Sequence, residues 1–105
     1  MSLRIDDPQF AERVRSSFER QNAMQLIQAT MPLVEAGCTE IHLPHWTGVE
    51  QQHGFVHGGV VGMIADSAAG YAAMTLVPAS ASVLTVEYKM NLVAPADGEK
   101  LIARG

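Results

Sequence analysis

The stretch "QQHGFVHGGVVGMIADSAAG", residues 51–70, largely decides how this chain folds. It opens with glutamines, histidines and glycines, and then becomes an apolar run that holds a single carboxylate, Asp66. The apolar run continues to Val77, and Pro78 is expected to stop a helix there, so the sequence predicts a helix over residues 58–77. Because this helix is apolar nearly all round, we expect other elements to wrap around it.

A second helical segment is predicted near the start of the chain. In "DDPQFAERVRSSFERQ", which begins at Asp6, apolar residues recur at helical spacing. Asp6 or Asp7 is suited to cap this helix, and Pro8 suits its first turn. The sequence therefore predicts an N-terminal helical segment within residues 1–25.

Alternating apolar and polar residues predict strands on both sides of the central helix. "TMPLVEAGCTEIHLP", residues 30–44, is predicted to form two short strands around Gly37. "SVLTVEYKMNLVAP", residues 82–95, alternates most clearly, and "EKLIARG", residues 99–105, begins a further strand. The order of these elements predicts one α+β domain over residues 1–105, with a sheet around one helix.

The composition argues against several classes of protein. Hydrophobic residues make up 48% of the chain and charged residues 17%, which is typical of a globular domain. The net charge is only −4 and the seven basic residues are scattered, so no nucleic-acid partner is expected. One cysteine, Cys38, suits a reducing cytoplasm, and the first twenty residues lack a signal peptide's apolar core. The longest apolar stretch, residues 60–77, contains Asp66, Ser67, two glycines and many alanines. It is therefore not apolar enough to span a membrane. We therefore expect a cytoplasmic protein without a membrane partner.

Two stretches of the sequence resemble a known family. "HGFVHGGVVGMIADSAAGYAA" and "TVEYKMNLVAPADGEKLIARG" resemble the hot-dog fold thioesterases of the PaaI-like (phenylacetate-degradation) branch. The similarity runs from about Glu40 to the end and rests on the His-Gly-Gly, the acid nine positions later and "LVAPADG". It implies a hot-dog fold, in which an antiparallel sheet wraps a long central helix. Relatives continue with two more long strands, so we expect a sheet that is shortened at its C-terminal end.

The resemblance also implies a function and a set of site residues. The family hydrolyses acyl-CoA thioesters as a homodimer or homotetramer, without a metal or bound cofactor. Asp66 would be the nucleophile or general base, and Gly58 and Gly59 would offer a backbone N–H to the thioester carbonyl. His57 would hold the start of the motif or orient the substrate. Gln51 stands where relatives place an amide that positions the attacking water or the carbonyl.

Two further positions are assigned to substrate binding, and several residues have a structural alternative. Thr85 matches a hydroxyl position that some relatives use to orient water, and His53 lies at the opening of the motif. Asp66 is alternatively a structural acid, His57 a helix cap, and Thr85 an ordinary strand residue. The four histidines (42, 45, 53 and 57) suggest a metal site, but no Cys or acid completes a ligand set, so we expect none.

Helix geometry predicts that the site is shared between chains. N–H groups in the first turn of a helix stabilise a developing negative charge, and a poorly solvated carboxylate is a better base or nucleophile. His57 and Asp66 are nine residues apart, or roughly 13 Å along the axis and about 180° in phase. If both serve one thioester, two chains must contribute, which predicts an obligate symmetric dimer.

Three functions remain as hypotheses from the sequence. The first is an acyl-CoA thioesterase for an aryl or medium-chain acyl group. The second is a non-catalytic hot-dog module that binds acyl-CoA or only assembles. The third is an enoyl-CoA hydratase-type activity, because that chemistry also occurs on this fold.

Overall fold

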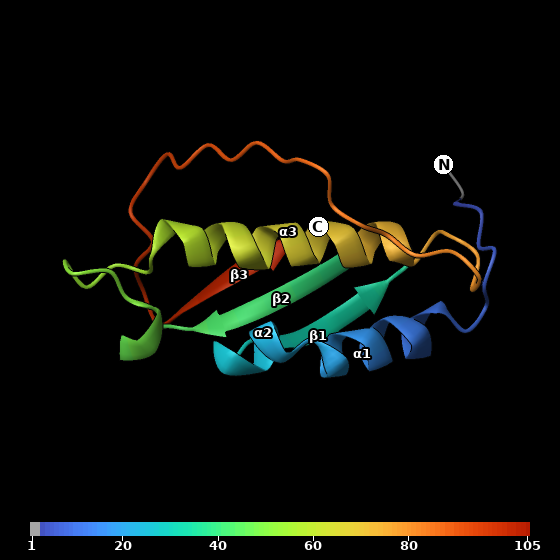
Figure 1. Ribbon diagram of the computed structural model, residues 1–105, viewed down its shortest axis with the longest axis horizontal. Helices are drawn as coiled ribbons and strands as arrows, with labels where there is room; N and C mark the ends of the chain where they lie inside the picture. Colours follow the sequence, from blue (N-terminus) through green and yellow to red (C-terminus); the bar gives the residue numbers. More distant parts are fainter. Residues whose placement is uncertain (1–2) are drawn as a thin grey trace.

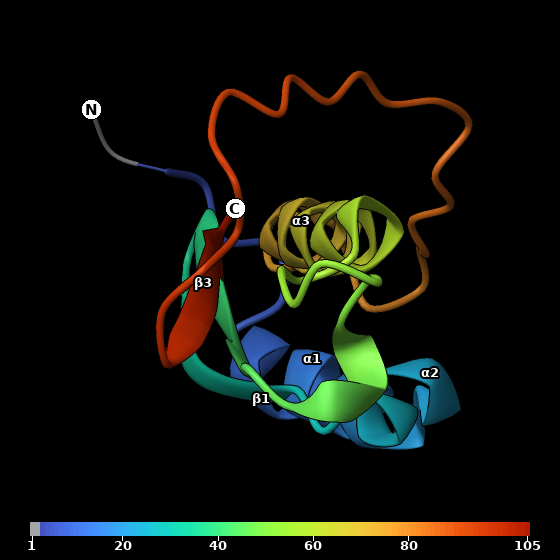
Figure 2. The same ribbon diagram turned by 90° about the vertical axis from the view of Figure 1, so that its left-hand side faces the viewer.

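A computed structural model describes residues 3–105 and shows a long helix packed against a three-stranded antiparallel sheet (Figure 1). The elements, in chain order, are α1 (Phe10–Arg20), α2 (Asn22–Leu26), β1 (Thr30–Glu35), β2 (Cys38–Pro44), the 3-10 helix η1 (Thr47–Val49), α3 (Gly58–Met74) and β3 (Lys100–Arg104). Figure 2 shows the sheet on one side of α3 and α1 and α2 on an adjacent side. The predicted α+β architecture, with an antiparallel sheet and a central helix, is confirmed.

The sheet has β2 in the middle, between β1 and β3. β1 and β2 are antiparallel and meet at Gly37, whose φ of +74° suits a residue without a Cβ. Along β2, Thr39, Ile41 and Leu43 are fully buried while the residues between them are partly exposed. This is the alternation that the sequence predicts, and it places one face of β2 under α3.

Helix α3 begins at Gly58, and it ends at Met74, three residues before Val77. The Thr75 hydroxyl donates to a carbonyl of the preceding turn at 2.6 Å. The Arg13 guanidinium donates to the carbonyls of Met74 and Val77 at 2.9 Å each. The bonds to Ala72 and Met74 satisfy carbonyls of the last helical turn, and the bond to Val77 holds the residues after it, so the helix ends before Pro78.

The N-terminal segment consists of two helices, α1 and α2. Gln21 separates α1 from α2 with an extended backbone (φ −82°, ψ 94°). The N-cap of α1 is Gln9, and neither Asp6 nor Asp7 caps the helix with its side chain. Asp7 instead accepts from the Gln9 N–H and from Arg13, both at 2.9 Å, because the turn at Pro8 places it before the helix.

The prediction of a strand over residues 82–95 is wrong. Within residues 3–105 this segment pairs with no strand; it forms an extended arch that passes over α3 (Figures 1 and 2). Leu84, Val86 and Val93 are 88%, 93% and 94% exposed. Alternation encodes the two faces of a strand, but a strand forms only where its backbone pairs with a neighbour. In the part of the chain that the structure describes, the arch has no strand to pair with.

The core lies between α3, the sheet and the N-terminal helices. Its fully buried side chains come from all of these elements and include Val14, Met24, Ile41, Leu43 and Ile64. Between Leu3 and Gly105, no helix has the length and apolar character needed to cross a membrane.

Replacing Arg13 with Met is expected to destabilise this arrangement. The substitution removes the bonds to the end of α3 and leaves the Asp7 carboxylate, which is 13% exposed, without its cation. We expect the free energy of unfolding to fall by about 2–4 kcal/mol. Chemical denaturation at fixed protein concentration measures the change. Arg20→Met is the control, because the Arg20 bond to Ser16 is exposed; a loss as large as that of Arg13→Met would contradict the role of Arg13.

Candidate active site

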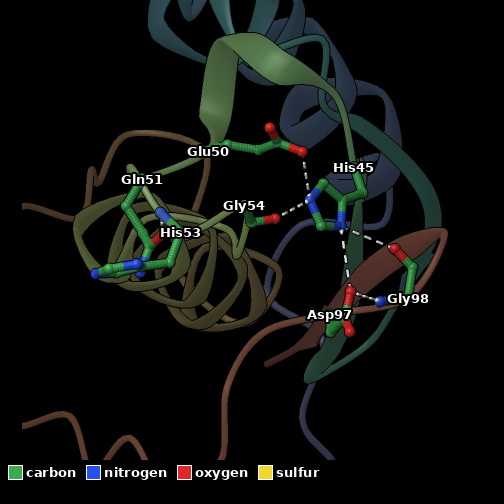
Figure 3. A network of polar contacts seen from close by, with 7 residues as sticks. All are labelled: His45, Glu50, Gln51, His53, Gly54, Asp97 and Gly98. Atoms are coloured by element: carbon green, nitrogen blue, oxygen red, sulfur yellow. Dashed lines mark hydrogen bonds and ion pairs between the residues drawn. The ribbon is translucent and has the colours of Figure 1, made fainter.

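The loop before α3 closes on itself through Gln51. The Gln51 N–H donates to the Phe55 carbonyl at 2.8 Å, and the Gly54 N–H donates to the Gln51 carbonyl at 3.0 Å. Gly54 has a φ of +87°, which the tight turn requires. The Gln51 side-chain oxygen accepts from the His53 N–H, while the His53 side chain itself is exposed (Figure 3). The loop therefore holds Gln51 in a defined position before the helix.

His57 caps α3, which is the structural alternative that the sequence left open. Its Nδ1 accepts from the Gly59 N–H at 2.8 Å, so this ring nitrogen carries no proton. A Cβ at position 59 would lie 2.9 Å from His57 Nδ1, so the glycine allows the ring to fold back. The N–H of Gly59 is therefore used within the chain. The N–H of Gly58, in contrast, forms no hydrogen bond within the part of the chain that the structure describes.

A cavity of about 470 Å³ lies at this end of α3. The helix side is lined by Gln51, Phe55, Val56, Gly58 and Val61. The rest is lined by residues 92–95 of the arch and by Ala96, which follows it. The helix dipole is positive at this end, and the first-turn N–H groups point out of the helix. An oxygen that gains negative charge is therefore stabilised here.

Asp66 lies on a different part of α3, beside a second cavity. Its side chain is half-buried, and its Oδ1 accepts from the Thr85 hydroxyl at 2.7 Å. The cavity, of about 310 Å³, is also lined by Ser17 of α1 and by Gln21, which follows α1. Tyr71 lies at its wall, with its hydroxyl accepting from Gln21 Nε2 at 2.9 Å. The arch thus brings Thr85 to Asp66 although it is not a strand.

The two cavities share no lining residue. Gln51 and Gly58 lie at one, and Asp66 and Thr85 lie at the other. A single chain therefore does not bring the N-terminal end of its α3, at Gly58, together with its own Asp66. Across the described residues, no cluster of three or more His, Cys, Asp or Glu side chains is placed to hold a metal ion.

His45, to which the sequence analysis gave no role in catalysis, stands at the centre of a polar network (Figure 3). Its Nδ1 lies 2.9 Å from the Gly98 carbonyl, and its Nε2 lies 2.9 Å from the Gly54 carbonyl and 2.8 Å from a Glu50 oxygen. Asp97 lies 4.0 Å from Nδ1. The bond to Gly98, together with those to Gly54 and Glu50, raises the pKa of His45. The partners come from separate segments, so no local sequence pattern reveals them.

Comparisons with known proteins identify the family. Residues 53–105 match the family model of the thioesterase superfamily. A thioesterase family protein from Silicibacter pomeroyi is 43% identical over 90% of this chain and 70% of that chain, with a TM-score of 0.88. The chain belongs to the thioesterase superfamily. No match was found among curated proteins.

More distant solved structures share the fold of this thioesterase-superfamily chain. A thioesterase from Haemophilus influenzae is 18% identical, covers 95% of this chain and 69% of its own, and has a TM-score of 0.81. The E. coli PaaI protein from the phenylacetic acid degradation operon is also 18% identical, over 91% and 68% of the two chains, with a TM-score of 0.69. The resemblance to hot-dog thioesterases that the motifs indicate is thereby confirmed.

Proposed function

We propose that this thioesterase-superfamily protein hydrolyses acyl-CoA thioesters that carry an aryl or medium-chain acyl group. The observation that carries the proposal is the Gly58 N–H, which has no partner in residues 3–105 and lies at the wall of an apolar cavity at the positive end of α3. Phe55, Val56 and Val61 in that wall suit an apolar acyl group.

The chemistry needs one group for the carbonyl oxygen and one for the attacking water. The Gly58 N–H and the helix dipole stabilise the oxyanion that forms when the carbonyl carbon is attacked. Asp66 takes a proton from the attacking water, or attacks the carbonyl carbon itself to give an anhydride that water then opens. The C–S bond breaks in either route, and coenzyme A leaves as the thiolate and is protonated. The products are a carboxylic acid and a free thiol.

The separation of the two cavities supports a site built from two protomers. We place the Gly58 end of one chain against Asp66 of its partner in a symmetric homodimer, with a tetramer as a pair of such dimers. Thr85 donates to Oδ1 of Asp66 at 2.7 Å and leaves the other carboxylate oxygen for water. Gln51 and His53 lie on the loop before α3, and Gln51 lines the same cavity as Gly58.

Release of free thiol from a panel of aryl and straight-chain acyl-CoA thioesters tests the proposal. We expect turnover with at least one of these substrates. Binding of acyl-CoA without thiol release would favour the non-catalytic module instead. Addition of water to an enoyl-CoA without thiol release would favour a hydratase.

A shared site predicts complementation between two inactive variants. Asp66→Asn keeps a working Gly58, and Gly58→Pro keeps a working Asp66. When equal amounts are co-expressed, half of the dimers combine the two variants, and each of these has one intact site of two. We therefore expect about a quarter of wild-type thiol release from the mixture. If each chain formed its own site, the mixture would be as inactive as either variant alone.

A further inference from the structure

We propose that His45 is a positioning residue for the loop that carries Gln51. His45 directly follows β2, and its ring joins this position to two other segments of the chain, the loop before α3 and the turn before β3 (Figure 3). We call the contacts of His45 with Gly54, Glu50 and Gly98 the His45 clasp. Its effect on catalysis rests on the proposed hydrolysis, whereas the clasp itself is a property of the fold.

The contacts of His45 require both ring nitrogens to carry a proton. Nδ1 lies 2.9 Å from the Gly98 carbonyl oxygen, and Nε2 lies 2.9 Å from the Gly54 carbonyl oxygen. A carbonyl oxygen only accepts, and a neutral imidazole has only one N–H to donate. Both hydrogen bonds therefore form together only in the imidazolium. Glu50, at 2.8 Å from Nε2, supplies a compensating negative charge, and the His45 side chain is only 13% exposed.

The clasp fixes the turn that holds Gln51. The Gly54 N–H donates to the Gln51 carbonyl, while the Gly54 carbonyl accepts from His45, so both polar groups of this backbone position are bound. The Val56 N–H donates to the Ala96 carbonyl at 3.0 Å, which ties the same loop to the segment before β3. A neutral ring keeps only one of the two bonds, so loss of the imidazolium separates the loop at Gly54 from the turn at Gly98.

The position of this loop matters because Gln51 and Gly58 line one cavity. A loosened loop lets the Gln51 side chain move relative to the Gly58 N–H, and small errors in placement cost large factors in rate. A clasp that only stabilised the fold would change the free energy of unfolding and leave turnover by the folded protein unchanged. A lower kcat in folded His45→Ala therefore indicates the positioning role, and an unchanged kcat indicates a purely stabilising role.

The clasp should be sensitive to pH because its ring must be charged. The charged side chains that face the ring are Glu50 at 2.8 Å and Asp97 at 4.0 Å. The pKa of His45 is raised, mainly by the hydrogen bond to Gly98. The clasp is therefore complete below pH of about 6.5, the ordinary histidine value, and is lost as the pH rises through the raised pKa of the folded protein.

NMR titration and hydrogen exchange test the clasp without any substrate. We expect the His45 ring in the full chain to titrate above 6.5, and to titrate lower in Glu50→Gln. Relative to their intrinsic exchange rates, which rise with pH, the Gly54 and Val56 amides should exchange faster in His45→Ala, and faster in the wild type above the His45 pKa than below it. His42→Gln is the matched control, because His42 lies on β2 just before His45 and its ring, within residues 3–105, forms a hydrogen bond only with Glu40, at 3.1 Å. Exchange at these amides should not change in this variant.

Kinetics test the positioning role. We expect His45→Ala to lower kcat about 10- to 100-fold, with KM changed less than about twofold. His45→Gln keeps one uncharged donor, so it should recover part of kcat and lose the decline of kcat that follows the His45 titration in the wild type. His42→Gln should match the wild type in both respects.

Three outcomes overturn the proposal: a His45 pKa at or below 6.5, unchanged amide exchange in His45→Ala, or unchanged kcat in a folded His45→Ala that is merely less stable. Failure of the proposed function is a separate result. If the wild type releases no thiol while the titration and the exchange behave as expected, the clasp stands and the hydrolase is rejected.

Discussion

Replacing Asp66 with Asn should lower kcat for acyl-CoA hydrolysis by about 10²- to 10⁴-fold. The amide has nearly the shape of the carboxylate, but it neither takes a proton from water nor attacks a carbonyl carbon. Its side-chain oxygen still accepts from the Thr85 hydroxyl, the bond that the structure shows at 2.7 Å. Thiol release at saturating substrate measures the loss.

Glu87→Gln is the control for Asp66→Asn. Glu87 is an exposed acid on the arch, two residues from Thr85, so its substitution removes the same charge without touching either cavity. We expect wild-type turnover from Glu87→Gln, and wild-type assembly from both variants by size-exclusion chromatography. Undiminished turnover by Asp66→Asn would remove Asp66 from the mechanism and leave it as a structural acid.

Gly58→Pro should lower kcat by about 10²- to 10³-fold, because it removes the N–H in the first turn of α3 that has no partner within residues 3–105 and can donate to the oxyanion. Proline is tolerated at the first position of a helix, where the N–H has no helical partner. The preceding residue, His57, has φ −58° and ψ 133°, an extended conformation that a residue before proline favours. The substitution should therefore remove the donor and leave α3 in place.

Gly58→Ala separates the missing donor from the added bulk. A Cβ at position 58 would lie 3.1 Å from Leu92 Cδ1, the end of a flexible and exposed side chain. We expect Gly58→Ala to retain turnover within about tenfold of the wild type. An equal loss in both variants would show that space at position 58, rather than its N–H, matters.

Much of the fold could be predicted because its signals are local. The alternation of Thr39, Ile41 and Leu43 places these residues on one face of β2, and all three are buried. The Gly-Gly after His57 marks the start of α3, and the helix begins there. In both cases the signal lies within a few neighbouring residues of one helix or strand, the distance over which periodic patterns are informative.

The candidate site could be predicted only in part. The spacing of His57 and Asp66 along one helix predicts that they do not share a site within one chain. The structure shows one cavity at the N-terminal end of α3 and a separate one beside Asp66. The same spacing does not show that His57 uses its ring to hold the Gly59 N–H, which leaves Gly58 as the open donor. That difference depends on a rotamer, which residue identity does not specify.

The sequence by itself determined the central helix, the hairpin of β1 and β2, the position of Asp66 on α3 and the family. Each of these depends on a pattern of residues that are close together in the chain. Tertiary structure alone decided that residues 82–95 form an unpaired arch that carries Thr85 to Asp66. It also decided that His45 joins Gly54 to Gly98. Pairing of a strand and protonation of a ring depend on partners that are distant in the chain, and local periodicity carries no information about them.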